Sequence, residues 1–496
     1  MNPRHHLITL LLLCATASVW AQRHNLADGL RYDTELAGVL STGDEAPLWF
    51  SANRFGVSST KPNWGYLRGG IFRDAEMDSA FHWKYGYGID LVVPVNFTSH
   101  FMVQQLYGSV QWKNFRVTLG VKEYHQDLLD DELSTGAMAL SNNARPIPQV
   151  RLELPKWWVW HFAGDWIALK GHLAYGMYTD SQWQSDWVST GNVYTRGSLF
   201  HSKAGFCRIG NEKVFPLTAT IGFEMMAQFG GHGYNIKART DSGETLNDVD
   251  LGNNARAFWD AFIPGGNDVN DGDYSNVAGN QLGAWHFDLK YQGKGWSLRG
   301  YAQHYFDDHS QLFFQYGWKD MLWGLEAELP RNPVVSHAVV EYLRTDDQTG
   351  GLYHDASDVL PIQMSGRDNY YNNHIYGAWQ HWGQALGNPL LLSPIYNTDG
   401  VLMFYYNRVR ALHVGIEGDP LPTLHYRLKY THLRTWGTYN VPTVDPLDEN
   451  YLLAELTWTP RWGKGFSVTG QWGLNTGDLL SKSNGIGLTI RKTGWF

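Results

Sequence analysis

The chain has 496 residues and a net charge of −9, with no block of basic residues, which excludes nucleic acid as a partner. Its 23 Trp, 27 Tyr and 22 Phe exceed what a soluble core requires. Because aromatic rings with a polar edge gather at both surfaces of a bilayer, this composition favours a β-barrel in a membrane.

Residues 1–21 have the pattern of a signal peptide. Arg4 precedes the apolar run of residues 7–19, and Ala21 provides a small residue at the expected cleavage position. This run is too short to cross a bilayer as a helix, and no later run reaches the roughly 18 apolar residues that such a helix needs. We therefore expect an exported protein that keeps Cys207 as its one cysteine and forms no internal disulfide.

Long runs of alternating apolar and polar residues follow along the chain. In residues 81–93 the odd positions are all aromatic or aliphatic, and the even positions from 82 to 90 are polar or glycine. The same alternation fills residues 106–121, 217–225, 285–303, 424–431 and 452–474, and a last run ends at Phe496. Successive side chains of a strand point to opposite faces, so each run has one apolar face.

These runs predict an all-β fold, a transmembrane antiparallel β-barrel over residues 22–496 with roughly 16–18 strands. Strands that cross a bilayer need about 9–11 residues, whereas typical soluble strands have about 5–6. A large soluble β-sandwich or propeller is the alternative class. The terminal Phe496 resembles the signal by which outer-membrane barrels are inserted, so we expect an outer-membrane location. Outer-membrane lipids and the barrel-assembly machinery are the corresponding partners.

Three regions interrupt the alternation, near residues 127–151, 230–280 and 377–392. We interpret them as inserted loops, including a short helical insertion or plug. The second region brings Asp268, Asn270, Asp271 and Asp273 close together, as in a calcium site. However, Val269 stands where the EF-hand template needs an oxygen ligand, so a solvated loop is the preferred interpretation.

The sequence contains no recognisable catalytic or cofactor motif. HExxH, GxSxG, a Gly-rich phosphate loop and zinc-spaced Cys/His clusters are all absent. The charges on the polar faces are of mixed sign, and we interpret His82, His172 and His425 as polar lining of the lumen. We therefore predict a protein that is not an enzyme and uses no cofactor or metal ion.

Several ordered motifs between residues 140 and 390 resemble those of the capsule-assembly Wzi family. They are residues 140–148, 279–285, 304–308 and 371–376, followed by Gly383 and Gly387. The motif positions within them include Ser141, Asn142, Asn143, Arg145, Pro146, Pro148, His374 and Tyr376. The resemblance implies an outer-membrane barrel with a helical element on the periplasmic side. It also implies a lectin-like, non-enzymatic role in organising capsular polysaccharide or exopolysaccharide at the cell surface.

Sugars present apolar C–H faces and hydroxyl edges, so aromatic rings flanked by polar groups suit them. Our candidate glycan-binding residues are carried by loops: Tyr353, His354, Trp379, His381 and Trp382. Two other functions stay open. The first is a porin-like outer-membrane channel for small solutes, and the second, less favoured, is a barrel enzyme that acts on lipids.

Overall fold

The computed structural model describes residues 27–78, 82–126, 128–239, 245–263, 279–307, 318–348 and 368–496. The expected signal peptide, residues 1–21, and the acidic group around Asp271 lie outside the described residues. No helix among the described residues is long and apolar enough to cross a membrane.

Eighteen antiparallel strands form one closed wall, because the first strand pairs with both the second and the last. This confirms the predicted fold class at the upper limit of the expected strand number. The wall consists of β1 (Leu30–Ser41), β2 (Asn63–Arg73), β3 (Trp83–Val95), β4 (Met102–Trp112), β5 (Phe115–Val121), β6 (Gln149–Val159), β7 (Ile167–Met177), β9 (Leu199–Ile209), β10 (Leu217–Phe229), β15 (Asn280–Gln292), β16 (Ser297–Asp307), β17 (Met321–Glu328), β18 (His337–Arg344), β23 (Val409–Leu421), β24 (Leu424–Gly437), β25 (Pro442–Trp458), β26 (Phe466–Gly477) and β27 (Ser483–Trp495).

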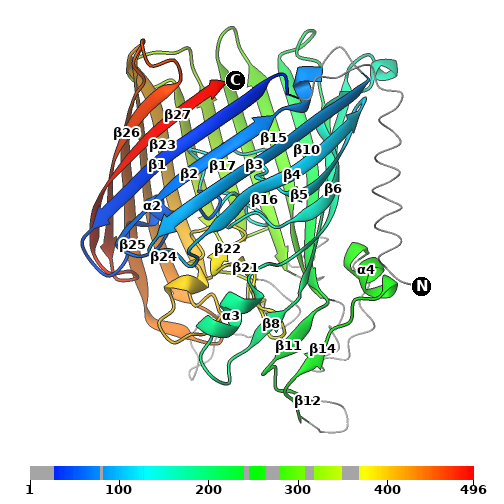
Figure 1. The fold of residues 1–496 in the computed structure, drawn as a ribbon, viewed down its shortest axis with the longest axis vertical. Coiled ribbons are helices and arrows are strands. Elements are labelled where there is room, and N and C mark those ends of the chain that lie inside the picture. Colours follow the sequence, from blue (N-terminus) through cyan, green and yellow to red (C-terminus); the bar gives the residue numbers. More distant parts are fainter. Residues whose placement is uncertain are drawn as a thin grey trace.

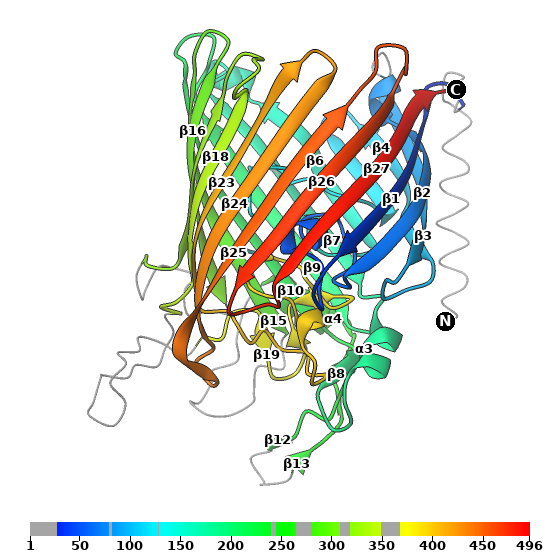
Figure 2. The ribbon, with the colours of Figure 1, turned by 90° about the vertical axis from the view of Figure 1, so that its left-hand side faces the viewer.

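The two ends of the barrel differ in the length of their connections (Figures 1 and 2). At one end, which we call the turn end, no connection between wall strands is longer than that of residues 74–82. At the other, the loop end, the connections include residues 122–148, 230–279 and 345–408. Outer-membrane barrels have short periplasmic turns and longer extracellular loops, so the loop end corresponds to the extracellular side.

The alternation seen in the sequence places apolar side chains on the outside of the wall. On β3, Ile89 and Val93 are 43% and 53% exposed, whereas Asp90 between them is 1% exposed and faces the lumen. An exposed apolar band of this kind is the surface that acyl chains cover. His172 and His425 face the lumen as predicted, but His82 lies exposed in the turn-end connection before β3, because the strand begins only at Trp83.

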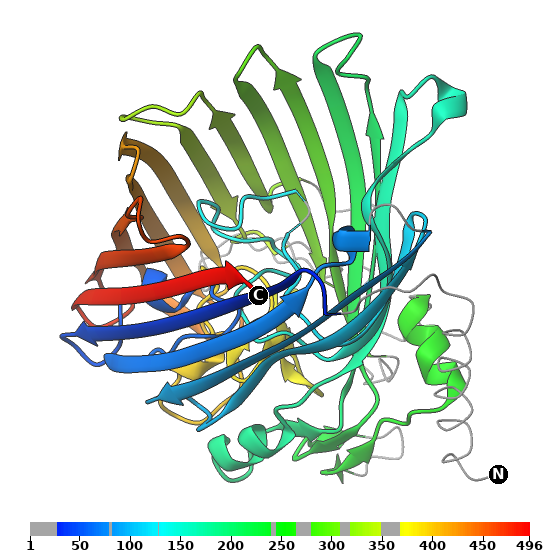
Figure 3. The ribbon, with the colours of Figure 1, turned by 45° about the horizontal axis from the view of Figure 1, so that its top comes forward.

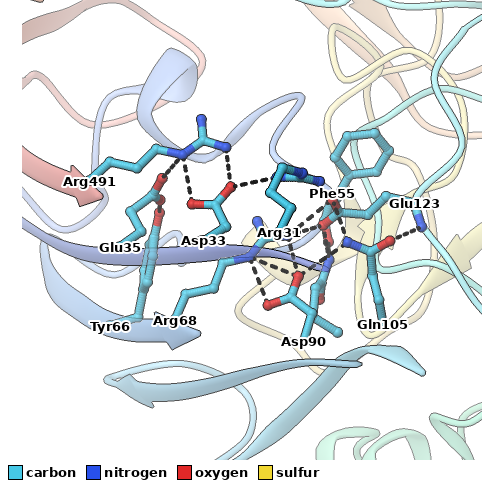
Figure 4. Close-up of polar contacts among 11 residues, drawn as sticks. Arg31, Asp33, Glu35, Phe55, Tyr66, Arg68, Asp90, Gln105, Glu123 and Arg491 are labelled. Atoms are coloured by element: carbon cyan, nitrogen blue, oxygen red, sulfur yellow. Dashed lines mark hydrogen bonds and ion pairs between the residues drawn. The ribbon is translucent and has the colours of Figure 1, made fainter. Parts of the chain in front are cut away.

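Charged side chains on the inside of the wall form ion pairs across neighbouring strands (Figure 4). The guanidinium of Arg68 donates to Asp90 at 3.0 Å and to Glu123 at 2.9 Å. Arg491 on β27 similarly binds Asp33 and Glu35 on β1. A lumen-facing charge is thus compensated by its neighbours, which agrees with the mixed signs seen in the sequence.

Three connections from the loop end fold back inside the wall and fill this half of the barrel. We call residues 44–60, 128–148 and 368–408 the plug. The plug contains α2 (Leu48–Ser51) and the hairpin of β21 (Gln380–His381) and β22 (Gln384–Ala385), which lie within the lower half of the barrel in Figure 1. Its largest side chains, including Phe50, Met138, Tyr371 and Phe404, are fully buried and pack with the wall in one core.

The plug also contains β19 (Asn372–Asn373), β20 (Gly377–Ala378) and the 3₁₀ turn η4 (Pro394–Tyr396). The other elements lie at the two ends of the barrel or beside it: α3 (Ser181–Trp187), α4 (Ala255–Phe262), β8 (Tyr194–Arg196), β11 (His232–Tyr234), β12 (Ala238–Arg239), β13 (Thr245–Leu246), β14 (Val249–Asp250), and the 3₁₀ turns η2 (Ala75–Asp78) and η3 (His161–Ala163). The sequence led us to expect a helical element on the periplasmic side, which is the turn end, and the structure differs there. The described part of the turn end has only the 3₁₀ turns η2 and η3, because the α-helices belong to connections of the loop end.

Candidate functional site

The motif at residues 141–143 joins the three segments of the plug. Ser141 donates its backbone N–H to the carbonyl oxygen of Leu386 at 2.7 Å. The Asn143 side chain donates to the carbonyl oxygen of Ala385 at 2.9 Å and accepts from the backbone N–H of Asn53 at 3.0 Å. Buried backbone groups need such partners, so these polar residues hold irregular chain inside the barrel.

Arg145 extends from this motif toward the loop end. Its guanidinium donates to the hydroxyls of Ser99 and Thr98 at 2.7 and 2.6 Å, and it lies 4.4 Å above the ring of Trp382. Burial lowers the pKa of the Arg145 guanidinium to about 10, and the group still carries its charge at neutral pH. A cation stacked on a tryptophan face stabilises the position of that ring.

Two of the predicted glycan-binding residues are inside the plug. Trp379 is 0% exposed and donates its indole N–H to the carbonyl oxygen of Ala139 at 2.7 Å. His381 is also 0% exposed, lies 2.9 Å from the carbonyl oxygen of Arg145, and has its pKa lowered by burial. The expectation that these two side chains meet a glycan is therefore wrong for this structure, because both serve as core residues of the plug. Tyr353 and His354 lie outside the described residues.

Trp382 reaches the loop end, where it belongs to a group of three half-buried tryptophans. The rings of Trp183 and Trp187 stack with their centroids 5.4 Å apart, and Trp183 lies 6.4 Å from Trp382. Trp382 has a φ of 57°, a conformation that bulky residues rarely adopt. The Asp180 carboxylate accepts its backbone N–H at 3.0 Å. The tight hairpin therefore directs this ring toward α3, and we call these three residues the tryptophan cluster.

A polar cleft of about 520 Å³ opens at the same end of the barrel. Its lining is rich in amide and carboxylate side chains: Asn192, Asn235, Asp307, Asp368, Asn369, Asn372, Asn373 and His374 contribute to it. Amides offer donors and acceptors together, which matches the hydroxyl groups of a sugar. We call this cavity the amide cleft.

The motif at residues 372–376 shapes the amide cleft from below. Asn372 exchanges two hydrogen bonds with the backbone of Phe404, at 2.7 and 3.0 Å. The Asn373 side chain accepts from the backbone N–H groups of Ile375 and Tyr376 at 2.9 and 3.1 Å. Burial lowers the pKa of His374. Tyr376 is 2% exposed and packs in one hydrophobic cluster with Ile236, which lines the cleft.

Three other motif positions make contacts inside the barrel and do not lie at the surface of the loop end. They are Asn142, Pro146 and Pro148. Asn142 is 2% exposed, and its carbonyl oxygen accepts the backbone N–H of Phe55 at 2.6 Å. Pro146 lines a second cavity, of about 90 Å³, between the plug and the wall. Pro148 precedes β6, and its carbonyl oxygen accepts the N–H of Met177 at 3.1 Å.

One group of side chains among the described residues has the composition of a metal site. Glu326, Glu328 and His337 bring one ligand atom each within 4.8 Å of one another on the lumen face. However, Arg299 already binds Glu326, and His337 lies 3.3 Å from Glu326 and 3.5 Å from Glu417. Ion pairing within the wall accounts for this group.

The sequence did not reveal Trp183, Trp187, Asn192 or Asn235 as surface residues of one site. The two tryptophans are four positions apart in a break of the alternation, which is the spacing of one face of a helix. The sequence therefore did contain a signal that these two tryptophans share one face of a helix. The convergence of the two asparagines with residues 368–377 depends on the path of the loops and has no local signature.

A closed antiparallel wall with an apolar outer band, an ion-paired interior and long loops at one end defines an outer-membrane β-barrel. No protein-family model matches the chain, and no curated protein matches it either. Among solved structures it is similar to Wzi of Escherichia coli, described as an outer-membrane protein involved in group 1 capsule assembly and a carbohydrate-binding β-barrel. That match has 11% identity and a TM-score of 0.54, and covers 92% of this chain and 83% of Wzi. The chain is also similar to OccK2 (OpdF) of Pseudomonas aeruginosa, with 9% identity, a TM-score of 0.48, and coverage of 94% and 98% of the two chains.

Proposed function

We propose that this protein is a non-enzymatic, lectin-like barrel of the Wzi type that holds capsular polysaccharide or exopolysaccharide at the cell surface. The observation that carries the proposal is the presence of both the tryptophan cluster and the amide cleft at the loop end, next to a plug that fills this half of the barrel. Aromatic faces and amides together provide both kinds of contact that a sugar chain makes. The similarity to a carbohydrate-binding barrel in fold supports the same function.

The double variant Trp183→Ala with Trp382→Ala tests the proposal. Each ring contributes about 0.5–1.5 kcal/mol beyond its buried area, so we expect binding of polysaccharide to weaken by about ten-fold or more. Affinity of the purified barrel in detergent for isolated cell-surface polysaccharide is the measurement. Trp462→Ala is the matched control, because Trp462 is 73% exposed in the connection between β25 and β26 at the opposite end. Equal affinity of the double variant and the control overturns the proposal.

Deletion of the protein provides a cellular test. We expect total synthesis of polysaccharide to stay constant, while the cell-bound fraction falls and the fraction released into the medium rises. Unchanged retention contradicts a role in attachment.

A channel for small solutes is the second candidate function. The cavity of about 90 Å³ between plug and wall favours it, since Lys122, Arg151 and Glu224 place charged groups along an otherwise largely apolar lining. Conductance in planar bilayers separates the two functions. Attachment of polysaccharide by a plugged barrel predicts little conductance, whereas a channel predicts stable openings in the wild-type protein.

A further inference from the structure

One part of the outer wall departs from the apolar pattern. Near the loop end, His201 and Lys203 on β9 and Gln281 on β15 have the outward parity of Cys207, Ile209 and Phe287. A charged or amide group facing acyl chains without a partner is costly. Even so, His201 is 0% exposed and Gln281 is 7% exposed. Another element therefore covers this patch from outside.

That element is α4, which lies outside the barrel beside β9 and β10 (Figure 3). Three outward side chains donate to carbonyl oxygens of this helix, two of them in its last turn. Tyr175 on β7 donates to Phe258 at 3.0 Å, Gln281 donates to Asp260 at 2.9 Å, and Lys203 donates to Phe262. The last carbonyls of a helix have no partner within the helix, and a cation there also complements the helix dipole.

The inner face of α4 is apolar and fits the wall. Ala257, Phe258 and Ala261 pack against Phe229 on β10 and Leu199 on β9 in a separate hydrophobic cluster. The start of the helix is fixed as well, because the Asn254 side chain accepts the backbone N–H of Ala257 at 3.0 Å. Both the polar and the apolar contacts hold the helix against the outside of the barrel.

A second side of α4, which the wall does not cover, combines apolar and charged side chains. Trp259 is 59% exposed and Ile263, the residue after the helix, is 44% exposed, and Arg256 on the same side pairs with Asp260 at 3.6 Å. The wall nearby exposes outward apolar side chains of the lipid-facing band. Val150, which pairs with Tyr175, is 52% exposed, and Met177 at the end of β7 is 51% exposed. The exposed side of the helix therefore continues a surface that the bilayer covers.

We propose that α4 is a membrane-interface anchor, with Trp259 and Ile263 inserted at the boundary between headgroups and acyl chains of the outer leaflet. The helix covers a polar patch of the wall and presents an amphipathic surface, whose charged pair suits the headgroups. Tryptophan is a preferred residue at that depth. The anchor also fixes the connection that contains β11 and β14 close to the membrane surface. This inference does not depend on the proposed binding of polysaccharide.

Spin labels at single cysteines test the contact with lipid. In a Cys207→Ser background, Trp259→Cys is labelled in vesicles of phosphatidylethanolamine and phosphatidylglycerol, and its collisions with oxygen and with a water-soluble nickel chelate are measured. Val150→Cys on the lipid-facing wall and Gln182→Cys on the exposed side of α3 are the two references. We expect the label at 259 to match the label at 150, with low access to nickel. Nickel access equal to that of the label at 182 overturns the proposal.

A second variant tests the docking of the helix. Lys203→Met removes the donor to Phe262, so we expect the label at 259 to become more mobile and more accessible to nickel. Lys290→Met is the control, because Lys290 faces the lumen near the turn end. Heat-dependent migration in gels verifies that each variant is folded. A label at 259 that is unaffected by Lys203→Met contradicts the docking contact.

Discussion

The wall and the plug occupy one barrel but are stabilised in different ways. In the wall, each strand repeats one pattern, and the backbone hydrogen bonds to its neighbours do not depend on side-chain identity. In the plug, individual polar side chains bind individual backbone groups: Asn388 alone contacts Thr135 at 3.1 Å, Gly136 at 2.6 Å and Leu390 at 3.0 Å. The effect of a substitution on stability should therefore depend, in the wall, on whether the side chain faces lipid or the lumen. In the plug it should depend on the individual contact that the substitution removes.

The largest expected effect concerns the two faces of one wall strand. Leu488 is 52% exposed on the outside of β27, and Thr489 beside it faces the lumen. Leu488→Lys places a charge among acyl chains and destabilises the barrel by about 2–4 kcal/mol. Thr489→Lys is the matched control and stays close to wild type. Unfolding in denaturant from lipid vesicles measures both, and equal losses contradict the assignment of faces.

A smaller effect is expected from a glycine of the plug. At Gly387, an added Cβ overlaps the Tyr371 hydroxyl and the Met138 carbonyl oxygen, whereas at Gly300 on the wall it meets nothing within 4 Å. Overpacking costs about 1–3 kcal/mol, so Gly387→Ala is expected to loosen the plug and raise conductance in planar bilayers. Gly300→Ala is expected to leave conductance unchanged. If neither variant raises conductance, the result is evidence against a closely packed plug.

A last expected effect concerns the pH dependence of stability at the junction of wall and plug. Asp320, just before β17, accepts the Tyr370 hydroxyl at 3.0 Å, and burial raises the pKa of its carboxyl to about 7. A raised pKa means that the folded protein binds this proton more tightly than the unfolded chain does. Stability from this group is therefore present at low pH, declines between about pH 4 and 7, and is absent above. Thermal unfolding across this range should show a decline that Asp320→Asn removes, and the same decline in the variant rules out Asp320 as its source.

Alternation predicted the wall well, because one face of each strand meets lipid and the other meets the lumen. The run beginning at residue 81 corresponds to β3, and the run ending at Phe496 corresponds to β27. The pattern could not reveal His201 and Lys203, which break the outward parity. Their environment depends on α4, an element more than fifty residues further along the chain.

The site was harder to predict because the plug has no periodicity. Trp379 and Trp382 are three positions apart in one aromatic segment, yet one is fully buried and the other reaches the loop end. Which ring faces solvent depends on the hairpin at Trp382 and on the contact with Arg145, residues far apart in sequence. The motif residues Ser141 and Asn143 form hydrogen bonds between plug segments, a role that the sequence did not indicate.

The seam between β1 and β27 has a consequence for biogenesis. β27 pairs with β1 along its length, and the backbone N–H of Phe496 donates to the carbonyl oxygen of Leu30 at 2.9 Å, so the barrel closes only after β27 has been synthesised. Until then the first strand presents an unpaired edge, which invites pairing with other chains. Contacts this distant in sequence also form slowly. Loss of a few residues from β27 should therefore harm folding far more than an insertion of equal length in an outer loop.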